Sequence, residues 1–215
     1  MSALFSLLLL LIFAAVVAFS YTEGLWGNAI RLINVVTAAL LAVNFFEPAG
    51  RWVEGLAEQA APYADFLSLW ILFLIFYSIL RVITDRFSRH KVRFMMIVDR
   101  IGSGFFACWT AWVIVCFATM SMHTAPLARN FMFGGFKPGE SMFFGMAAPD
   151  MQWLAFTQTV SRQAFSRTVS EGAYGYDADR PSESKLAVFD RQAVFIPKYA
   201  AFRSIVESKG AIPKR

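Results

Sequence analysis

Four runs of apolar residues, each about as long as a bilayer is thick, dominate the first 120 residues of this chain. They occupy residues 2–21, 24–46, 66–83 and 101–120. A helix needs about 20 residues to cross the hydrocarbon core. Only helices or closed barrels satisfy their backbone hydrogen bonds in lipid. The sequence therefore predicts an all-α membrane protein with about four transmembrane helices.

The distribution of charge predicts where the membrane part ends. Charged residues make up only 16% of the chain, against about 25% in ordinary soluble domains. From Arg129 onward the chain carries 12 of its 20 Lys and Arg and 8 of its 15 Asp and Glu. We therefore expect a transmembrane domain over residues 1–122 and a C-terminal extramembrane region over residues 123–215.

One or two short helices are expected in the C-terminal region. Asp150 follows Pro149 and has the residue type of a helix N-cap. A second helix is expected over residues 198–208, with Tyr199 turned inward. In the first helix the spacing predicts one apolar face, formed by Trp153, Phe156, Val160 and Ala164.

Two connecting segments leave alternatives open. The run over residues 2–21 lacks the basic start and the short apolar core of a signal peptide, so a retained helix is favoured over a cleaved one. Only a few residues separate it from the second run, which predicts a tight helical hairpin. The connector over residues 47–65 contains Pro48 and Pro62, and a short interfacial helix is expected over residues 51–61.

The basic loop between the third and fourth runs sets the expected orientation. Six Lys and Arg lie between Arg81 and Arg100, whereas the other short connections hold one or none. Lys and Arg in short loops favour the cytoplasmic side. We therefore expect this loop in the cytoplasm, and the N-terminus and the C-terminal region on the non-cytoplasmic side of the membrane.

A polar stripe in the second run gives the first candidate functional residues. Asn28, Arg31 and Asn34 recur every three residues, so they lie near one helical face. Polar side chains in a membrane helix usually face other helices. Arg31 is expected either to pair with Asp99 or Asp85, or to extend toward lipid headgroups.

Small residues supply candidate contacts between helices. Gly102 and Gly104 begin the fourth run, and Ser103, Ala107 and Ala111 follow at four-residue spacing. Small residues at that spacing let two helix backbones approach closely. Gly24 and Gly27, at the start of the second run, are further candidates for helix packing.

No pattern in the sequence indicates an enzyme. There is no catalytic carboxylate pair, no metal-ligand spacing and no phosphate-binding loop, so no catalytic residue, metal or cofactor is expected. Cys108 and Cys116 are too far apart on one helix to form a disulfide. The net charge of +5 is concentrated in the basic loop, so nucleic acid is not an expected partner.

Two segments resemble the CvpA, or colicin V production protein, family. The first is the start of the second run with Gly24, Gly27 and Arg31, and the second is the sequence from Asp99 and Arg100 through the glycines that follow. The second segment is similar to that family's Asp-Arg-x-x-Gly motif, with the glycines here at slightly different spacing. The resemblance covers roughly residues 1–125.

The resemblance implies a bacterial inner-membrane protein linked to peptide-toxin export and to the cell envelope. We therefore expect an accessory or scaffold protein, with the lipid bilayer and either further copies of itself or another membrane protein as partners. The alternative is a small-solute channel or transporter subunit in which the stripe of Asn28, Arg31 and Asn34 lines the path.

Overall fold

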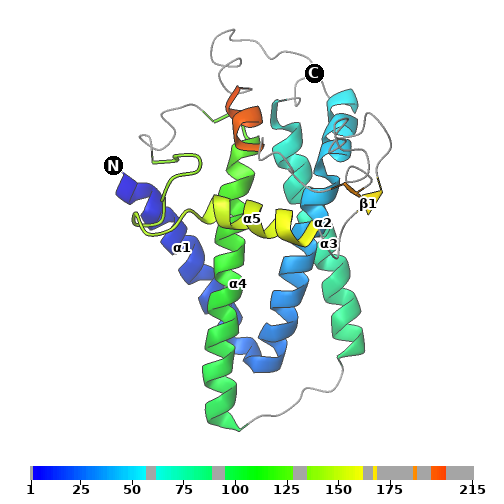
Figure 1. Cartoon of the computed structure of the whole chain (residues 1–215). Helices are drawn as coiled ribbons and strands as arrows, with labels where there is room; N and C mark the ends of the chain where they lie inside the picture. Colours follow the sequence, from blue (N-terminus) through cyan, green and yellow to red (C-terminus); the bar gives the residue numbers. More distant parts are fainter. Residues whose placement is uncertain are drawn as a thin grey trace.

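The computed structural model describes residues 2–56, 62–88, 95–127, 135–161, 167–168, 186–187 and 195–201. Four long helices form the body of the molecule (Figure 1). The C-terminal region adds a shorter helix, a helical segment over residues 195–201 and a two-residue antiparallel strand pair. The elements are α1 (Ser2–Ser20), the 3-10 turn η1 (Tyr21–Glu23), α2 (Gly24–Leu56), α3 (Ala64–Phe87), α4 (Met96–Thr124), α5 (Pro149–Ser161), β1 (Arg167–Thr168) and β2 (Leu186–Ala187).

Three apolar helical stretches are long enough to cross a membrane. They are Ala3–Gly55, Ala64–Phe87 and Met96–Thr124. The first stretch has 53 residues and is folded back on itself at η1, so that α1 and α2 form a hairpin (Figure 1). The chain is therefore an all-α, multi-pass membrane protein whose four long helices run alternately up and down.

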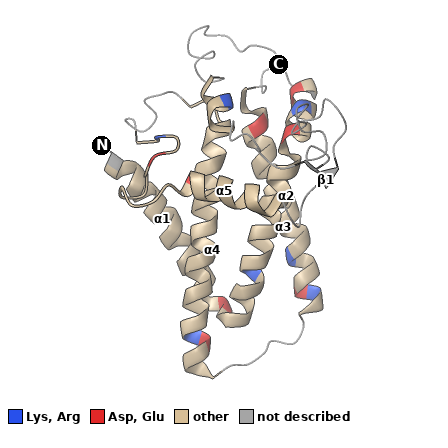
Figure 2. Ribbon diagram, viewed as in Figure 1, with Lys and Arg blue, Asp and Glu red and all other residues tan. Residues whose placement is uncertain are grey.

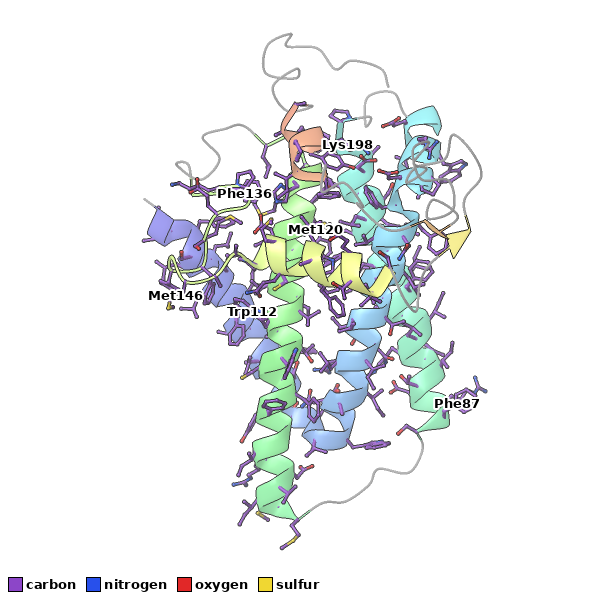
Figure 3. All side chains as sticks on the ribbon, in the orientation of Figure 1. Phe87, Trp112, Met120, Phe136, Met146 and Lys198 are labelled. Carbon is purple, nitrogen blue, oxygen red and sulfur yellow. The ribbon has the colours of Figure 1, made fainter. Side chains whose placement is uncertain are left out.

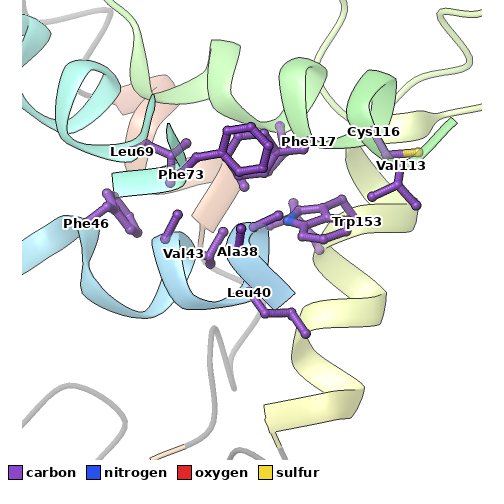
Figure 4. Packing of buried hydrophobic residues seen from close by; sticks show 14 of the residues in the cluster. Ala38, Leu40, Val43, Phe46, Leu69, Phe73, Val113, Cys116, Phe117 and Trp153 are labelled. Atoms are coloured by element: carbon purple, nitrogen blue, oxygen red, sulfur yellow. The ribbon is translucent and has the colours of Figure 1, made fainter. Parts of the chain in front are cut away.

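The long helices pack in the spatial order α1, α4, α2, α3. α4 packs on both α1 and α2, and α2 makes its most extensive contacts with α3. The buried core is built from small residues of α2 facing aromatic residues of α3 and α4 (Figure 4). Ala38, Ala39 and Ala42 are fully buried there, and Ala107 and Ala111 are fully buried on α4. Small side chains bring the backbones together, which is how helices associate in lipid.

α2 continues further than the sequence predicts. Pro48 lies inside the helix, and the separate interfacial helix expected over residues 51–61 is replaced by the last turns of α2, as far as Leu56; residues 57–61 lie outside the described part. Proline usually ends or kinks a helix. Here the far end of α2 is held against the start of α3, where a Cβ on Gly50 would lie only 2.5 Å from Oδ1 of Asp65. Packing between α2 and α3 thus outweighs the tendency of Pro48 to end the helix.

The short helix α5 lies across the bundle rather than apart from it (Figure 1). It packs mainly on α4. The apolar face predicted for it is only partly right. Trp153 is buried, but Phe156 is 40% exposed, and Thr157 and Ser161 are buried in its place. Ser161 satisfies its hydroxyl within its own helix, by donating to the carbonyl of Gln158 at 2.9 Å, and can therefore be buried at little cost.

Candidate functional site

The α1–α2 hairpin end of the bundle carries a cluster of polar contacts, and it begins at the turn itself. Gly24 has φ of +77°, a conformation that favours glycine. The carboxylate Oδ1 of Asp99, from α4, accepts a hydrogen bond from the backbone N–H of Leu25 at 3.0 Å. The first N–H groups of a helix have no partner within the helix, and they attract negative charge. Asp99 therefore anchors the start of α2 to α4.

Asn28 ties three elements together. Its Nδ2 donates to the carbonyl of Ser20 at 2.8 Å and to Oγ of Ser103 at 2.9 Å. The Ser103 hydroxyl in turn donates to the carbonyl of Tyr21 at 3.0 Å. Asn28 is fully buried. Asn28 therefore joins α2 to the end of α1 and to α4, and Ser103 extends the connection to the turn η1.

Arg31 pairs with a residue that the sequence reading did not propose. Its guanidinium forms an ion pair with Glu23 of η1, and the side chain is buried, with the whole residue only 6% exposed. Arg81 of α3 also bonds Glu23, with Nη2 at 3.1 Å and Nη1 at 3.3 Å. The expected pairing of Arg31 with Asp99 or Asp85 is wrong, because Asp99 bonds the start of α2 and Asp85 bonds Arg81 at 2.9 Å.

The hairpin explains why Glu23 is the partner. The turn η1 lies beside the first turns of α2, so a carboxylate eight residues earlier in the chain meets Arg31 without leaving the hairpin. Figure 2 shows the charged residues gathered toward the two ends of the long helices. The sequence feature that could have indicated this pair is the position of Glu23, in a short turn directly before the polar face of α2.

Asn34 completes the stripe. Its Nδ2 donates to Oγ1 of Thr84 on α3 at 2.9 Å, and the side chain is buried. The three stripe residues thus reach three different neighbours: Asn28 reaches α4, Arg31 reaches η1 and Asn34 reaches α3. Each stripe residue therefore contacts another element of the protein.

The four candidate packing glycines have different surroundings. A Cβ on Gly102 would lie 2.0 Å from Cδ1 of Leu25, so the Leu25 side chain of α2 occupies the space beside Gly102 on α4. A Cβ on Gly27 would lie 3.2 Å from Cβ of Glu23, and Gly24 serves the turn. Within the described part of this chain Gly104 contacts no other helix, because a Cβ there would meet nothing within 4 Å. A packing role for Gly104 therefore stays a prediction.

A second polar cluster lies at the opposite end of the bundle, where the C-terminal region docks. Nε2 of His123 on α4 hydrogen-bonds Oδ2 of Asp150 on α5 at 2.9 Å, and both side chains are fully buried. The same oxygen accepts the backbone N–H of Gly139 at 2.9 Å. Asp150 was expected to cap its own helix, but it instead lies within the first turn of α5 and bonds α4 and the preceding loop.

The helical segment over residues 195–201 docks at the same end. The Tyr199 hydroxyl donates to Oδ2 of Asp65 at 2.8 Å, and Tyr199 is buried as its predicted inward position requires. Nζ of Lys198 lies 2.7 Å from Oε1 of Glu47; Figure 3 labels Lys198 at this end of the molecule. The expected continuation of this helix to residue 208 lies outside the described residues. Sequence reading missed these pairs, since their members are more than 130 residues apart.

Neither cluster has the composition of a metal site. Among the described residues, no group of three or more His, Cys, Asp or Glu side chains is placed to hold a metal ion. Cys108 and Cys116 are both free thiols, the first exposed and the second buried. What both clusters do is join elements that are distant in sequence.

Comparison with known proteins identifies the family of this chain. A family model described as colicin V production protein matches residues 5–148. The chain belongs to the colicin V production protein family. The match covers the four long helices and the loop that follows α4, and it ends directly before α5. It extends further than the roughly 125 residues expected from the sequence. No curated protein and no solved structure matches this chain.

Proposed function

We propose that this colicin V production family member is a non-enzymatic accessory or scaffold protein of the bacterial inner membrane. In this role it supports secretion of a peptide toxin and homeostasis of the envelope. One observation carries the proposal: each of the three polar side chains of the α2 stripe is bonded to another element of the protein. Asn28, Arg31 and Asn34 are all buried, and each holds a neighbouring element.

The same observation weakens the channel alternative. A polar stripe that lines a water-filled path keeps hydrogen-bonding groups turned toward the path. Here the Asn28 amide donates to two protein oxygens, the Asn34 amide donates to Thr84, and Arg31 pairs with Glu23. These groups stabilise a rigid unit instead of hydrating a pore. A rigid unit with apolar outer faces suits a protein that acts by binding other membrane components.

The charges favour one orientation for this unit. Arg81, Arg86 and Arg100 lie at the hairpin end of the bundle, so the positive-inside rule assigns that end to the cytoplasm. α5 and residues 195–201 then lie toward the opposite face of the membrane. A reporter fused after Arg215 tests this assignment: alkaline phosphatase activity is expected, and green fluorescence from a cytoplasmic reporter would reverse the orientation.

Exposed apolar side chains on α3 supply a surface for self-association or for another membrane protein. Ile71, Ile75, Ile79 and Val82 are all exposed on the protein surface. In lipid such a face is either covered by acyl chains or packed on another helix. We propose that a homo-oligomer, or a complex with a second membrane protein, uses this face.

Reconstitution of the purified protein separates the scaffold from the channel. Ion and small-solute flux is measured in proteoliposomes, and the oligomeric state is measured by light scattering in mild detergent. The scaffold proposal predicts no flux above that of empty liposomes, and a loss of assembly in Arg31→Ala. Arg86→Ala, at an exposed arginine near the same end, is the matched control. Flux in the wild-type protein that Arg31→Ala abolishes would establish the channel instead.

A further inference from the structure

A groove of about 430 Å³ runs between α1 and α3, with α2 and α4 as its floor. Its existence follows from the packing order. α1 packs chiefly on α4, and α3 packs chiefly on α2, so these two outer helices flank the inner pair without being each other's main neighbour. The volume falls in the range of small-molecule sites, about 300–1,000 Å³.

The groove is polar at one end and apolar along the rest. Arg31 and Ser20 lie at the end nearest the hairpin, and Tyr77 joins them from α3. Further from the hairpin the lining is Val35, Phe73 and Ile114. The helix directions set this order, since α2 runs away from the hairpin end while α3 runs toward it. The lining thus changes from cationic and hydroxyl-bearing to aliphatic and aromatic over about one helical turn.

Arg31 is the residue that points to a ligand. Its relative exposure is only 6%, and its Nη2 forms the ion pair with Glu23. Its Nε has no hydrogen-bond partner in the described part of the chain. A buried charged group with an unused donor is costly unless an acceptor is supplied. The ring of Phe19, 5.9 Å from the guanidinium carbon, adds a cation–π contact but accepts no conventional hydrogen bond.

From this arrangement we infer that the groove binds one anionic phospholipid, with its phosphate at Arg31 and an acyl chain lying along Val35 and Phe73. Arginine binds phosphate oxygens through several N–H groups at once. The depth also fits. Arg31 lies seven residues into α2, about 10 Å along the helix axis, and this is near the headgroup level of the leaflet that the basic hairpin end faces.

The size of the groove suits part of an acyl chain better than a transmembrane helix. A helix about 10 Å across fills about 420 Å³ in a single turn of about 5.4 Å. The groove therefore has room for roughly one helical turn, whereas a helix crossing the bilayer needs more than five. An acyl chain is narrow enough for one part of it to lie in the groove while the rest continues into the bulk lipid.

Native mass spectrometry on the full-length protein in mild detergent tests the inference. The protein is titrated with phosphatidylglycerol and, in a second arm, with phosphatidylcholine of the same chains. One phosphatidylglycerol is expected to bind at least tenfold more tightly than phosphatidylcholine. Inorganic phosphate at millimolar concentration is expected to leave this binding unchanged. Equal binding of the two lipids, or displacement by phosphate, would overturn the inference.

Two variants and one control locate the site. Arg31→Met is expected to abolish the preference for phosphatidylglycerol. Leu74→Trp, at a partly exposed groove residue, fills the groove without touching the charge and is expected to lower affinity at least tenfold in a protein that still folds. Ile83→Trp, at an exposed position of α3 outside the groove, is expected to bind like the wild type. Unchanged binding by Leu74→Trp, or equal losses in Leu74→Trp and Ile83→Trp, would overturn the inference.

Discussion

His123 of α4 and Asp150 of α5 form a hydrogen bond of 2.9 Å, and neither side chain has any exposure to solvent. They are 27 residues apart in sequence, and the bond fastens the start of α5 to the end of a membrane-spanning helix. Because Asp150 also accepts the N–H of Gly139, one carboxylate fixes the loop after α4, the start of α5 and α4 itself.

The first prediction concerns this carboxylate. Asp150→Ala leaves the His123 imidazole buried without its partner, which costs about 1–3 kcal/mol, and α5 is expected to detach from the bundle. Trypsin cleavage after Arg162 or Arg167 is expected to become faster, and the thermal unfolding midpoint in detergent to fall. Glu140→Ala is the control, because its ion pair with Lys137 is exposed at 3.2 Å. Equal cleavage rates in the two variants would contradict the role given to Asp150.

A second prediction compares two glycines of α4 that are two residues apart. Gly102→Ala places a methyl group where Leu25 now lies, and overpacking of this kind costs about 1–3 kcal/mol. Gly104→Ala meets open space and replaces glycine in a helix, which is worth about 0.5–1 kcal/mol in favour of the variant. Thermal unfolding in detergent is therefore expected to shift in opposite directions. Leu25→Ala alone is expected to lower the unfolding midpoint. The double variant Gly102→Ala with Leu25→Ala is expected to unfold at a higher temperature than Leu25→Ala alone, because the new methyl group fills part of the space that Leu25 leaves.

The third prediction concerns Asn28. Asn28→Leu removes the donor that joins Ser20 to Ser103 and leaves a buried carbonyl without that bond, at a cost of about 1–3 kcal/mol. The end of α1 is expected to loosen from α4, which a pair of spin labels on these helices measures as a broader distance distribution. Thr22→Val, at an exposed position of the same turn, is expected to change nothing. A distribution as narrow as that of the wild type would show that packing alone holds α1.

The fourth prediction concerns Tyr199. Tyr199→Phe keeps the ring and removes the hydroxyl that donates to Asp65 at 2.8 Å. A bond to a charged group contributes about 1.5–3 kcal/mol, so hydrogen exchange of residues 195–201 is expected to accelerate on the order of tenfold or more. The exchange of α5 is expected to stay the same, since Asp150 holds it independently. Acceleration spread evenly over both segments would mean that they dock as one unit.

The membrane architecture is the part that residue patterns alone could predict. Uncharged apolar runs separated by polar turns specify helices that cross lipid, and four such runs became the four long helices. The three-residue spacing of Asn28, Arg31 and Asn34 likewise places them on one side of α2. Both inferences rest on spacing within one helix. The regular geometry of the helix converts that spacing directly into positions on its surface.

The partners of these side chains could not be predicted in the same way. Asp99, Asp85 and Glu23 are all acidic and all lie near the hairpin end, so the sequence offers Arg31 three candidates. The choice depends on angstrom-scale placement of η1 against α2. The pairs His123–Asp150 and Tyr199–Asp65 depend on how the C-terminal region crosses the bundle, and no short-range pattern encodes that path.

The place of α1 in the bundle has a consequence for the order in which the protein is built. Phe5 and Leu9 of α1 are buried against Val115 of α4 and against Phe136 and Met142 of the loop beyond it. The Ser6 hydroxyl donates to the carbonyl of Met142 at 2.8 Å. These partners follow Phe5 and Leu9 in the chain by more than 100 residues, so α1 meets them late in synthesis. Until they have been translated, lipid or a chaperone must shield the apolar face of α1.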